Sequence, residues 1–416
     1  MKRRLLPILM TLVLVCALPI WAAFVTSGDV TNPLVCTAGA AELNLQGMID
    51  RANAGDTIKL SSNTEIAATL QITKNLTLDL NGCVLRMRGT GSVLKVSDRA
   101  TLTITDSSAA KSGTITGGNA EDGGGVYVEA YATLEMTGGC ITGCRAVDGG
   151  GVYVDYNATL KMTGGCITDC HASYGGGGIY SYENLYMGGT AKIEKCTSKW
   201  GSDDAIWNRE KCNIYADGGT VDGTVNNQGT IRRSEGAAAE TVFNGTVYNR
   251  SAGTIIAGIY NETVENNGTI TGGTFWGTVT NKKSAWGNEA GTIRGGTFAV
   301  TFDRSDGTKT EPTLVEWNGK VSRPTSDPEK SGHTFVGWYL GDALYDFNTP
   351  VNAPLTLTAR WEEVPSSGGN YYYHPTTDTK ADDTKGSPKT ADPGVALYAA
   401  LSLLSLTGLT CTAKKR

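Results

Sequence analysis

The sequence predicts an all-β protein whose largest part is a three-faced parallel β-helix. The first observation is an internal repeat, because the segment from Gly123 to Asp148 recurs almost unchanged from Gly149 to Tyr174, with equivalent residues 26 positions apart. A fixed period of this length is the signature of a repeat architecture. The second observation is that each period holds three short runs of alternating apolar and polar residues, separated by turn residues. Such runs predict three strands per coil.

Equivalent residues of neighbouring coils should lie above one another, about 4.8 Å apart, as paired parallel strands do. We expect Leu134 to stack on Leu160 and Ile141 on Ile167, in an interior that no single coil can close alone. The pattern covers residues 58–298, enough for roughly ten coils. Residues 28–57 precede it, and their amphipathic part should cap the open end of the core. These coils resemble the right-handed β-helix repeats of bacterial surface proteins, which implies right-handed winding.

A second module is predicted at residues 299–363, where aromatic and β-branched runs alternate with Gly, Pro and Asp. The stretches Val300–Asp303, Gly337–Tyr339, Tyr345–Asn348 and Ala359–Trp361 resemble the Listeria–Bacteroides repeat, also called the internalin B-type repeat. The resemblance implies a small β-grasp-like module that acts as a spacer near the cell wall. Its core should hold Trp338, Phe347 and Trp361, and an exposed aromatic binding patch is the alternative.

Both ends of the chain carry targeting features. Residues 1–27 begin with basic residues followed by an apolar run, which predicts a secretory signal peptide. Residues 364–386 are polar and of low complexity, and we expect a disordered linker there. The apolar run at 395–413 would be roughly 28 Å long as a helix, just enough to span a bilayer, and a basic tail follows it.

Residues 387–416 resemble the cell-wall sorting signal of Gram-positive surface proteins. The motif of that family is Leu-Pro-x-Thr-Gly, which sortase cleaves between Thr and Gly. Pro388, Lys389 and Thr390 match it, whereas Ser387 and Ala391 depart from it. The resemblance implies sortase and cell-wall peptidoglycan as partners and an extracellular, wall-anchored location. The alternative is a plain single-pass membrane anchor through the C-terminal helix.

The repeat also aligns cysteines and tyrosines. Cys140 should stack on Cys166, which makes this pair the candidate disulfide, whereas Cys140 and Cys144 are roughly 13 Å apart along a strand and too far to bridge. A ladder of small side chains, some of them oxidised, is the simpler interpretation of the cysteine columns. The candidate binding stripe is formed by Tyr127, Tyr153 and Tyr180. Stacked tyrosines could meet a sugar or a partner protein, or could simply stabilise the sheet.

The sequence predicts no catalytic residues, no metal site and no cofactor. The stacked pairs Asp122/Asp148 and Glu129/Asp155 could hold a cation, but turn-forming residues on a solvated surface are the favoured interpretation. The net charge of -5, without a basic cluster outside the termini, argues against nucleic acid as a partner. We therefore expect a non-catalytic surface protein, adhesin-like or a structural display rod, that binds a glycan or host protein. The alternative is a carbohydrate-active β-helix enzyme, either a polysaccharide lyase or a glycoside hydrolase.

Overall fold

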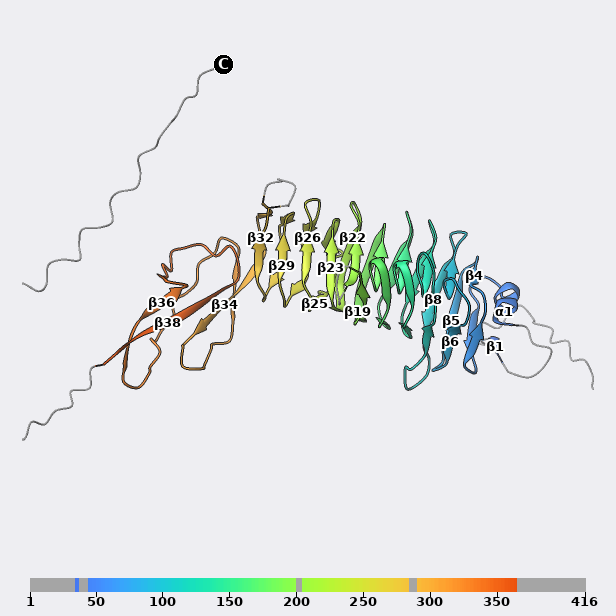
Figure 1. Ribbon diagram of the computed structural model, residues 1–416, viewed down its shortest axis with the longest axis horizontal. Helices are drawn as coiled ribbons and strands as arrows, with labels where there is room; N and C mark the ends of the chain where they lie inside the picture. The colour runs from blue at the N-terminus through green and yellow to red at the C-terminus, as the bar shows by residue number, and fades with distance from the viewer. Residues whose placement is uncertain (1–33, 37–43, 200–203, 284–289, 365–416) are drawn as a thin grey trace, which may run out of the picture. The chain divides into compact units, whose positions relative to one another are not determined.

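The structure is a computed structural model that describes residues 34–36, 44–199, 204–283 and 290–364 (Figure 1). The predicted signal peptide at 1–27, the sorting segment at 387–416 and all of the predicted linker except residue 364 lie outside the described residues. Within the described part the chain is all-β, apart from one short helix, α1 (Leu45–Arg51). The prediction of an all-β chain is confirmed, and the strands pair mostly in parallel.

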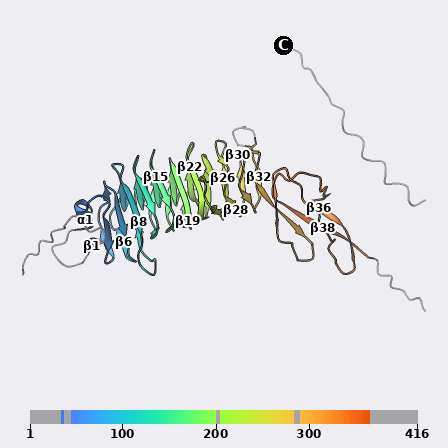
Figure 2. The same ribbon diagram turned by 180° about the vertical axis from the view of Figure 1, so that it is seen from behind.

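Three parallel ladders run through residues 57–298, which we call the coil stack (Figures 1 and 2). The first ladder contains β4 (Leu70–Ile72), β7 (Leu94–Val96), β10 (Val126–Val128), β14 (Val152–Val154), β18 (Ile179–Ser181), β21 (Asp204–Asn208), β23 (Thr224–Asn227), β26 (Val247–Asn249), β29 (Val264–Asn266) and β32 (Val279–Asn281). It thus crosses ten successive coils. The stacking is consistent with a parallel β-helix.

The second and third ladders share two long strands, β19 (Asn184–Glu194) and β22 (Asn213–Asp222), which pass from one ladder to the other. The second ladder also has β1 (Leu34–Cys36), β2 (Thr57–Leu60), β5 (Leu76–Asp79), β8 (Thr101–Thr105), β11 (Thr133–Met136), β15 (Thr159–Met162), β24 (Thr230–Arg232), β27 (Thr254–Ile255), β30 (Thr269–Ile270) and β33 (Thr292–Ile293). The third also has β3 (Thr64–Ile66), β6 (Val84–Met87), β9 (Thr114–Thr116), β12 (Cys140–Thr142), β16 (Cys166–Thr168), β25 (Val242–Phe243), β28 (Ile259–Tyr260), β31 (Thr274–Phe275) and β34 (Thr297–Asp303).

A fourth, short ladder was not predicted from the sequence. Its strands are β13 (Arg145–Asp148), β17 (His171–Gly175) and β20 (Thr197–Ser198), which pair in parallel. They lie in the connection between the third ladder of one coil and the first ladder of the next. The backbone of this connection is extended enough to pair with its equivalents, although its side chains lack the apolar alternation that marks a strand in sequence.

The packing of the interior follows the repeat. Leu134 pairs with Leu160 and Ile141 with Ile167, and all four side chains are buried. Burying each of these side chains contributes about 1.5–3 kcal/mol. Later coils replace the aliphatic column of the third ladder with a stack of rings, from Phe243 through Tyr260 and Phe275 to Phe298.

The N-terminal end of this interior is covered by α1. Asn44 caps the helix by accepting a hydrogen bond from the N–H of Gly47 at 2.9 Å. Leu45 and Ile49, on the same helix face, are buried in the core. The structure therefore places an amphipathic helix where the sequence suggests a cap, and it adds β1, which pairs with β2 in parallel.

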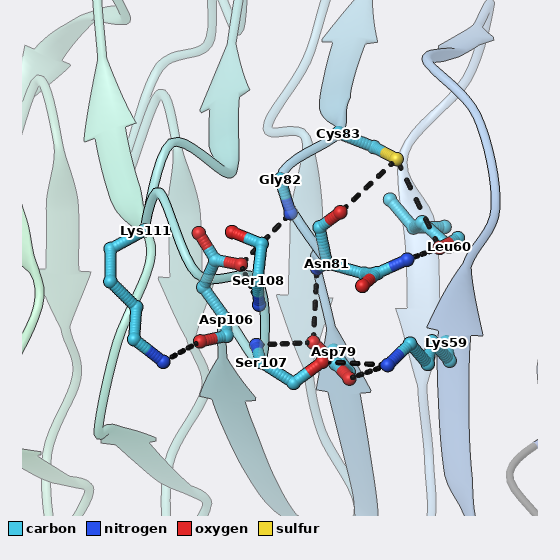
Figure 3. Close-up of polar contacts among 10 residues, drawn as sticks. All are labelled: Lys59, Leu60, Asp79, Asn81, Gly82, Cys83, Asp106, Ser107, Ser108 and Lys111. Carbon is cyan, nitrogen blue, oxygen red and sulfur yellow. Dashed lines mark hydrogen bonds and ion pairs between the residues drawn. The ribbon is translucent and has the colours of Figure 1, made fainter.

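Two buried aspartates organise the turn between β5 and β6 and its equivalent one coil later (Figure 3). Asp79 Oδ1 accepts hydrogen bonds from the N–H groups of Asn81 at 3.0 Å and Ser107 at 2.9 Å. Its other oxygen lies 3.4 Å from Lys59 Nζ. Asp79 thus ties its own turn to the turn of the following coil.

Asp106 ties its own turn to the turn of the preceding coil (Figure 3). Its Oδ1 accepts from the N–H of Gly82 at 2.8 Å and of Ser108 at 3.0 Å, and its Oδ2 accepts from Gly113 N–H at 2.6 Å. Backbone N–H groups donate hydrogen bonds to both carboxylate oxygens of Asp106. We therefore interpret this polar cluster as one that stabilises the turns.

The module at the C-terminal side begins inside a strand of the coil stack. The first residues of β34 pair with β31, and its later residues pair in parallel with β38 (Leu355–Glu363). β35 (Thr313–Glu316) is antiparallel to β34, while β36 (His333–Leu340) is antiparallel to β38 and to β37 (Ala343–Leu344). Trp338 is buried against Phe302, whereas Phe347 and Trp361 are partly buried at the edge of the core.

Candidate binding face

The central residues of the first-ladder strands form one column on the outer side of the coil stack. In coil order they are Gln71, Lys95, Tyr127, Tyr153, Tyr180, Trp207, Asn226, Tyr248, Glu265 and Thr280. The residues that flank each of them point inward, as Val126 and Val128 do around Tyr127. The strand alternation therefore positions the three predicted tyrosines on one face.

The three tyrosines are in contact but are not equally exposed. The ring centroids of Tyr127 and Tyr153 are 5.5 Å apart, and those of Tyr153 and Tyr180 are 5.7 Å apart. Tyr127 and Tyr153 are half-buried, whereas only 2% of Tyr180 is exposed. The expectation of an exposed stripe of three is therefore corrected at Tyr180. This ring is covered by Tyr182 and Trp207, whose centroids lie 5.5 Å and 6.2 Å away, so it supports the surface from beneath.

Four further aromatic side chains extend this surface. Tyr182 contacts Tyr153 and Tyr156, and Trp207 contacts Tyr174. Tyr156 is 56% exposed and Tyr174 is 45% exposed. We call the whole group the aromatic face, which consists of Tyr127, Tyr153, Tyr156, Tyr174, Tyr180, Tyr182 and Trp207.

Charged side chains border the aromatic face. Lys95 Nζ lies 5.4 Å from the centre of the Tyr127 ring and 3.1 Å from Glu129 Oε1. The Arg209 guanidinium lies over Tyr182 at 5.2 Å. Both contacts are within the range of cation–π attraction.

Carboxylates lie at the same border. The Tyr127 hydroxyl donates a hydrogen bond to Asp155 Oδ2 at 3.0 Å, and Asp122 is paired through its backbone with Asp148 of the next coil. Burial, together with the negative charges of Asp148, Glu121 and Asp155, raises the pKa of Asp122 to about 6. Burial also raises the pKa of Asp148. The contribution of neighbouring carboxylates at Asp122 indicates a local excess of negative charge there, whereas at Asp148 the positive charge of Arg209 lowers the pKa.

A shallow cavity of about 460 Å³ opens at the Tyr127 end of the aromatic face. Its lining includes Gln71, Lys95, Glu121, Asp122 and Tyr127. One aromatic ring, that of Tyr127, thus lines the cavity together with hydrogen-bonding and charged groups, which are the kinds of group that orient a ligand in a binding site. In the part of the chain that the structure describes, no group of three or more His, Cys, Asp or Glu side chains is placed to hold a metal ion.

The cysteines form two columns, as the repeat predicts. A disulfide joins Cys140 to Cys166, whose Cα atoms are 4.5 Å apart, within the range that a disulfide requires. Cys144, Cys170 and Cys196 are buried thiols in the neighbouring column, and each lies near the carbonyl of the residue two positions earlier. Buried thiols of this kind behave as small apolar side chains and make no site at the surface.

Several residues of the aromatic face could not be selected from the sequence. Trp207 occupies the same column as Tyr180, but the repeat unit itself has changed by that point in the sequence. Tyr156, Tyr174 and Tyr182 lie in turns or in the fourth ladder, outside the repeated strand pattern. The predicted sorting motif, Ser387 to Ala391, lies outside the described residues.

The composition of the C-terminal module agrees with its fold, because its aromatic motifs supply the rings that pack between β34, β36 and β38. Residues 298–360 match the Listeria-Bacteroides repeat domain. The resemblance found in the sequence is therefore confirmed for this repeat. Its first residue lies within β34, one residue before the predicted boundary, because the coil stack and the Listeria-Bacteroides repeat share that strand.

Two relatives are similar to a short part of the chain, and both come from Evansella cellulosilytica. One, provisionally named a Gly-rich membrane protein, is 35% identical over 69 residues, which are 16% of this chain and 8% of the relative. The other, provisionally named a membrane protein, is 33% identical over 69 residues, which are 16% of this chain and 10% of the relative. The chain thus spans about a tenth or less of the length of these relatives.

No solved structure matches the chain. Among the described residues, no helix has both the length and the apolar character needed to cross a bilayer. The predicted membrane segment at 395–413 is not among those residues.

Proposed function

We propose that this protein is a cell-surface protein in which the coil stack presents the aromatic face to a glycan. The observation that carries this proposal is the continuous contact among seven aromatic side chains beside a cavity with hydrogen-bonding groups. Tyrosine and tryptophan offer rigid apolar area together with a polar tip, and this combination suits the apolar faces and hydroxyl groups of sugars.

Surface location is supported by the Listeria-Bacteroides repeat and by the names of the two membrane-protein relatives. We propose that residues 1–27 direct export, that residues 364–386 form a flexible linker, and that sortase attaches the chain to peptidoglycan through the motif at Ser387–Ala391. We also take the winding of the coil stack as right-handed, because parallel strand crossovers adopt that hand almost without exception.

The test is a glycan array probed with the full chain in detergent micelles. We expect binding to a defined glycan class and a loss of about tenfold or more in affinity for Tyr153→Ala and Tyr156→Ala, as for anchor residues of other interfaces. Tyr248→Ala and Tyr131→Ala are matched controls. Tyr248 occupies the same column outside the aromatic face, and Tyr131 is 54% exposed, nearly as much as Tyr156. Equal losses in all four variants, or no binding to any glycan, would contradict the proposal.

One observation favours the enzyme alternative. Asp122, with its pKa raised to about 6, lines the cavity together with Lys95, as a general acid of a glycoside hydrolase or a charge partner in a lyase would. The array-positive glycan should therefore be incubated with the chain and analysed by mass spectrometry. Shortened products that disappear with Asp122→Asn would establish catalysis. An intact glycan would show that the protein binds the glycan without cleaving it.

A further inference from the structure

The aromatic face is bordered by more negative than positive charge. The carboxylates around it belong to Glu121, Asp122, Glu129, Asp148 and Asp155. The cations are Lys95, which is already paired with Glu129, and Arg209, which lies over Tyr182. A ligand that meets this surface therefore meets a region of negative potential.

The charge of Asp122 is not compensated by a direct partner in the described part of the chain. Among the described residues no side chain or backbone donor forms a hydrogen bond or ion pair with its carboxylate. Asp148, one coil away, accepts one backbone hydrogen bond, from Gly175 at 3.3 Å. Asp155 accepts from the Tyr127 hydroxyl and from the N–H of Tyr156. Asp122 and Asp148 thus form a stacked pair of carboxylates in which Gly175 and Arg209 stabilise the charge of Asp148, whereas the charge of Asp122 has no direct partner among the described residues.

This pair lies where a ligand would be in contact with the rings. Asp122 and Tyr127 line the same cavity, and Tyr127 is the first ring of the aromatic face. Asp148 and Asp155 belong to the next coil, beside Tyr153. A cation held between the carboxylates would therefore lie close to the aromatic rings. An organic cation can pack against these rings, whereas an inorganic ion gains nothing from this apolar surface.

Building on the proposed glycan binding, we propose that the aromatic face selects a glycan with free amino groups, whose ammonium groups bind between Asp122 and Asp148. Sugar rings would pack on Tyr127 and Tyr153, while the ammonium relieves the repulsion between the stacked carboxylates. A uronic-acid glycan would instead add negative charge to this border, and a neutral glycan would leave the repulsion in place.

The preference is measurable with three probes of equal length: oligomers of glucosamine, of N-acetylglucosamine and of galacturonic acid. Titration calorimetry with the full chain in detergent micelles, at about pH 6.5, should give the tightest binding for the glucosamine oligomer, by about tenfold over the acetylated one. Asp122→Asn and Asp148→Asn should reduce this preference about tenfold, because they weaken the binding of the glucosamine oligomer more than that of the N-acetylglucosamine oligomer. Glu135→Gln is the control, because Glu135 pairs with Lys161 on the second ladder, away from the aromatic face.

The outcomes separate this inference from the proposed function. Equal affinity for glucosamine and N-acetylglucosamine oligomers, or tighter binding of the uronate, would overturn the selection of amino glycans but leave glycan binding in place. A lysine oligomer that binds as tightly as the glucosamine oligomer would overturn it as well, since charge alone would then explain the affinity. Failure of all the oligosaccharides to bind would remove both proposals.

Discussion

At the scale of single residues, two aspartates of the coil stack have opposite electrostatic roles. Asp106 is buried, and burial by itself raises its pKa, but hydrogen bonds from Ser108, Gly113 and Gly82 outweigh that effect and lower the pKa overall. At Asp122 no such donors are present among the described residues, so burial and neighbouring carboxylates raise the pKa to about 6. The carboxylate of Asp106 therefore stabilises a turn, whereas the carboxylate of Asp122 is repelled by the negative charges of its neighbours.

Replacing Asp106 should make the protein less stable at neutral pH. The folded pKa lies below that of an unfolded aspartate, about 3.9, so the ionised carboxylate stabilises the fold at neutral pH and this contribution is lost as the pH falls below about 4. Asp106→Asn should lower the free energy of unfolding by about 1–2 kcal/mol at pH 7 and weaken its acid dependence. Denaturant titrations at several pH values measure both effects. Asp98→Asn, at an exposed turn aspartate, is the control, and an equal effect there would contradict the assignment.

Replacing Asp122 should have the opposite effect. Its folded pKa lies above the unfolded value, so the stability of the free protein should rise as the pH falls through about 6. Asp122→Asn should therefore stabilise the protein at about pH 7.5, by about 1 kcal/mol after allowance for solvent screening, and flatten this part of the pH profile. Thermal unfolding at pH values on both sides of 6 tests the prediction. A variant that melts earlier than the wild type at neutral pH would show that Asp122 has a stabilising partner.

At the scale of single elements, one of the two inward-facing columns of the first ladder changes from aliphatic to polar side chains along the coil stack. Asn208, Asn227, Asn249 and Asn266 are fully buried, and each amide donates to the side-chain oxygen of the next one, at 2.7–2.8 Å. The last donor in this column bonds to Asn281. Identical amides stack well because a parallel ladder places each one directly above its equivalent.

Breaking this asparagine column should cost more than a single hydrogen bond. Asn249→Ala removes the acceptor for Asn227 and the donor for Asn266, which leaves buried polar atoms without partners, so we expect a loss of about 2–4 kcal/mol. Asn261→Ala is a matched control, because Asn261 donates to Asn244 in a similar pair at the exposed surface. Urea unfolding of both variants measures the difference, and similar losses would mean that burial of the column contributes little.

The shared strand β34 is the second feature at this scale. Phe298 closes the ring stack that begins at Phe243, and Val300, two residues later, already pairs with Leu355 of the Listeria-Bacteroides repeat. The repeat therefore joins the coil stack through a continuous strand, without an intervening linker. In the part of the chain that the structure describes, the Listeria-Bacteroides repeat thus follows the last coil directly.

At the scale of the whole molecule, the features of the chain fit a protein that is exported and held at the cell surface. A signal-like N-terminus, a coil stack, a Listeria-Bacteroides repeat and a sorting-like C-terminus follow one another in the sequence. We predict cleavage after Thr390. Pro388 favours an extended backbone at Ser387, and the basic tail would hold the motif near the outer face of the membrane. Mass spectrometry of muralytic digests from the native organism should recover a peptide that ends at Thr390 with a cross-bridge remnant. Intact protein that detergent extracts, still with its C-terminal Lys-Lys-Arg, would instead show a plain membrane anchor.

The strand register and much of the interior could be predicted from the sequence alone. A parallel coil places each residue over its equivalent, so a period of 26 directly aligns Leu134 with Leu160 and Cys140 with Cys166. The motifs of the Listeria-Bacteroides repeat were equally visible, and they supply the rings that pack in its core. The register of the coils depends on local periodicity, which the order of residues expresses without reference to the rest of the fold.

Only the tertiary structure decided the composition of the aromatic face. It buries Tyr180 beneath Tyr182 and Trp207, and it brings Tyr156 from a turn and Tyr174 from the fourth ladder to the same surface. The sequence determines which strand residues point outward, because side chains alternate along each strand. Which of them stay exposed depends on how turns of unequal length fold over the ladder, and that is a property of packing between coils rather than of any repeat in the chain.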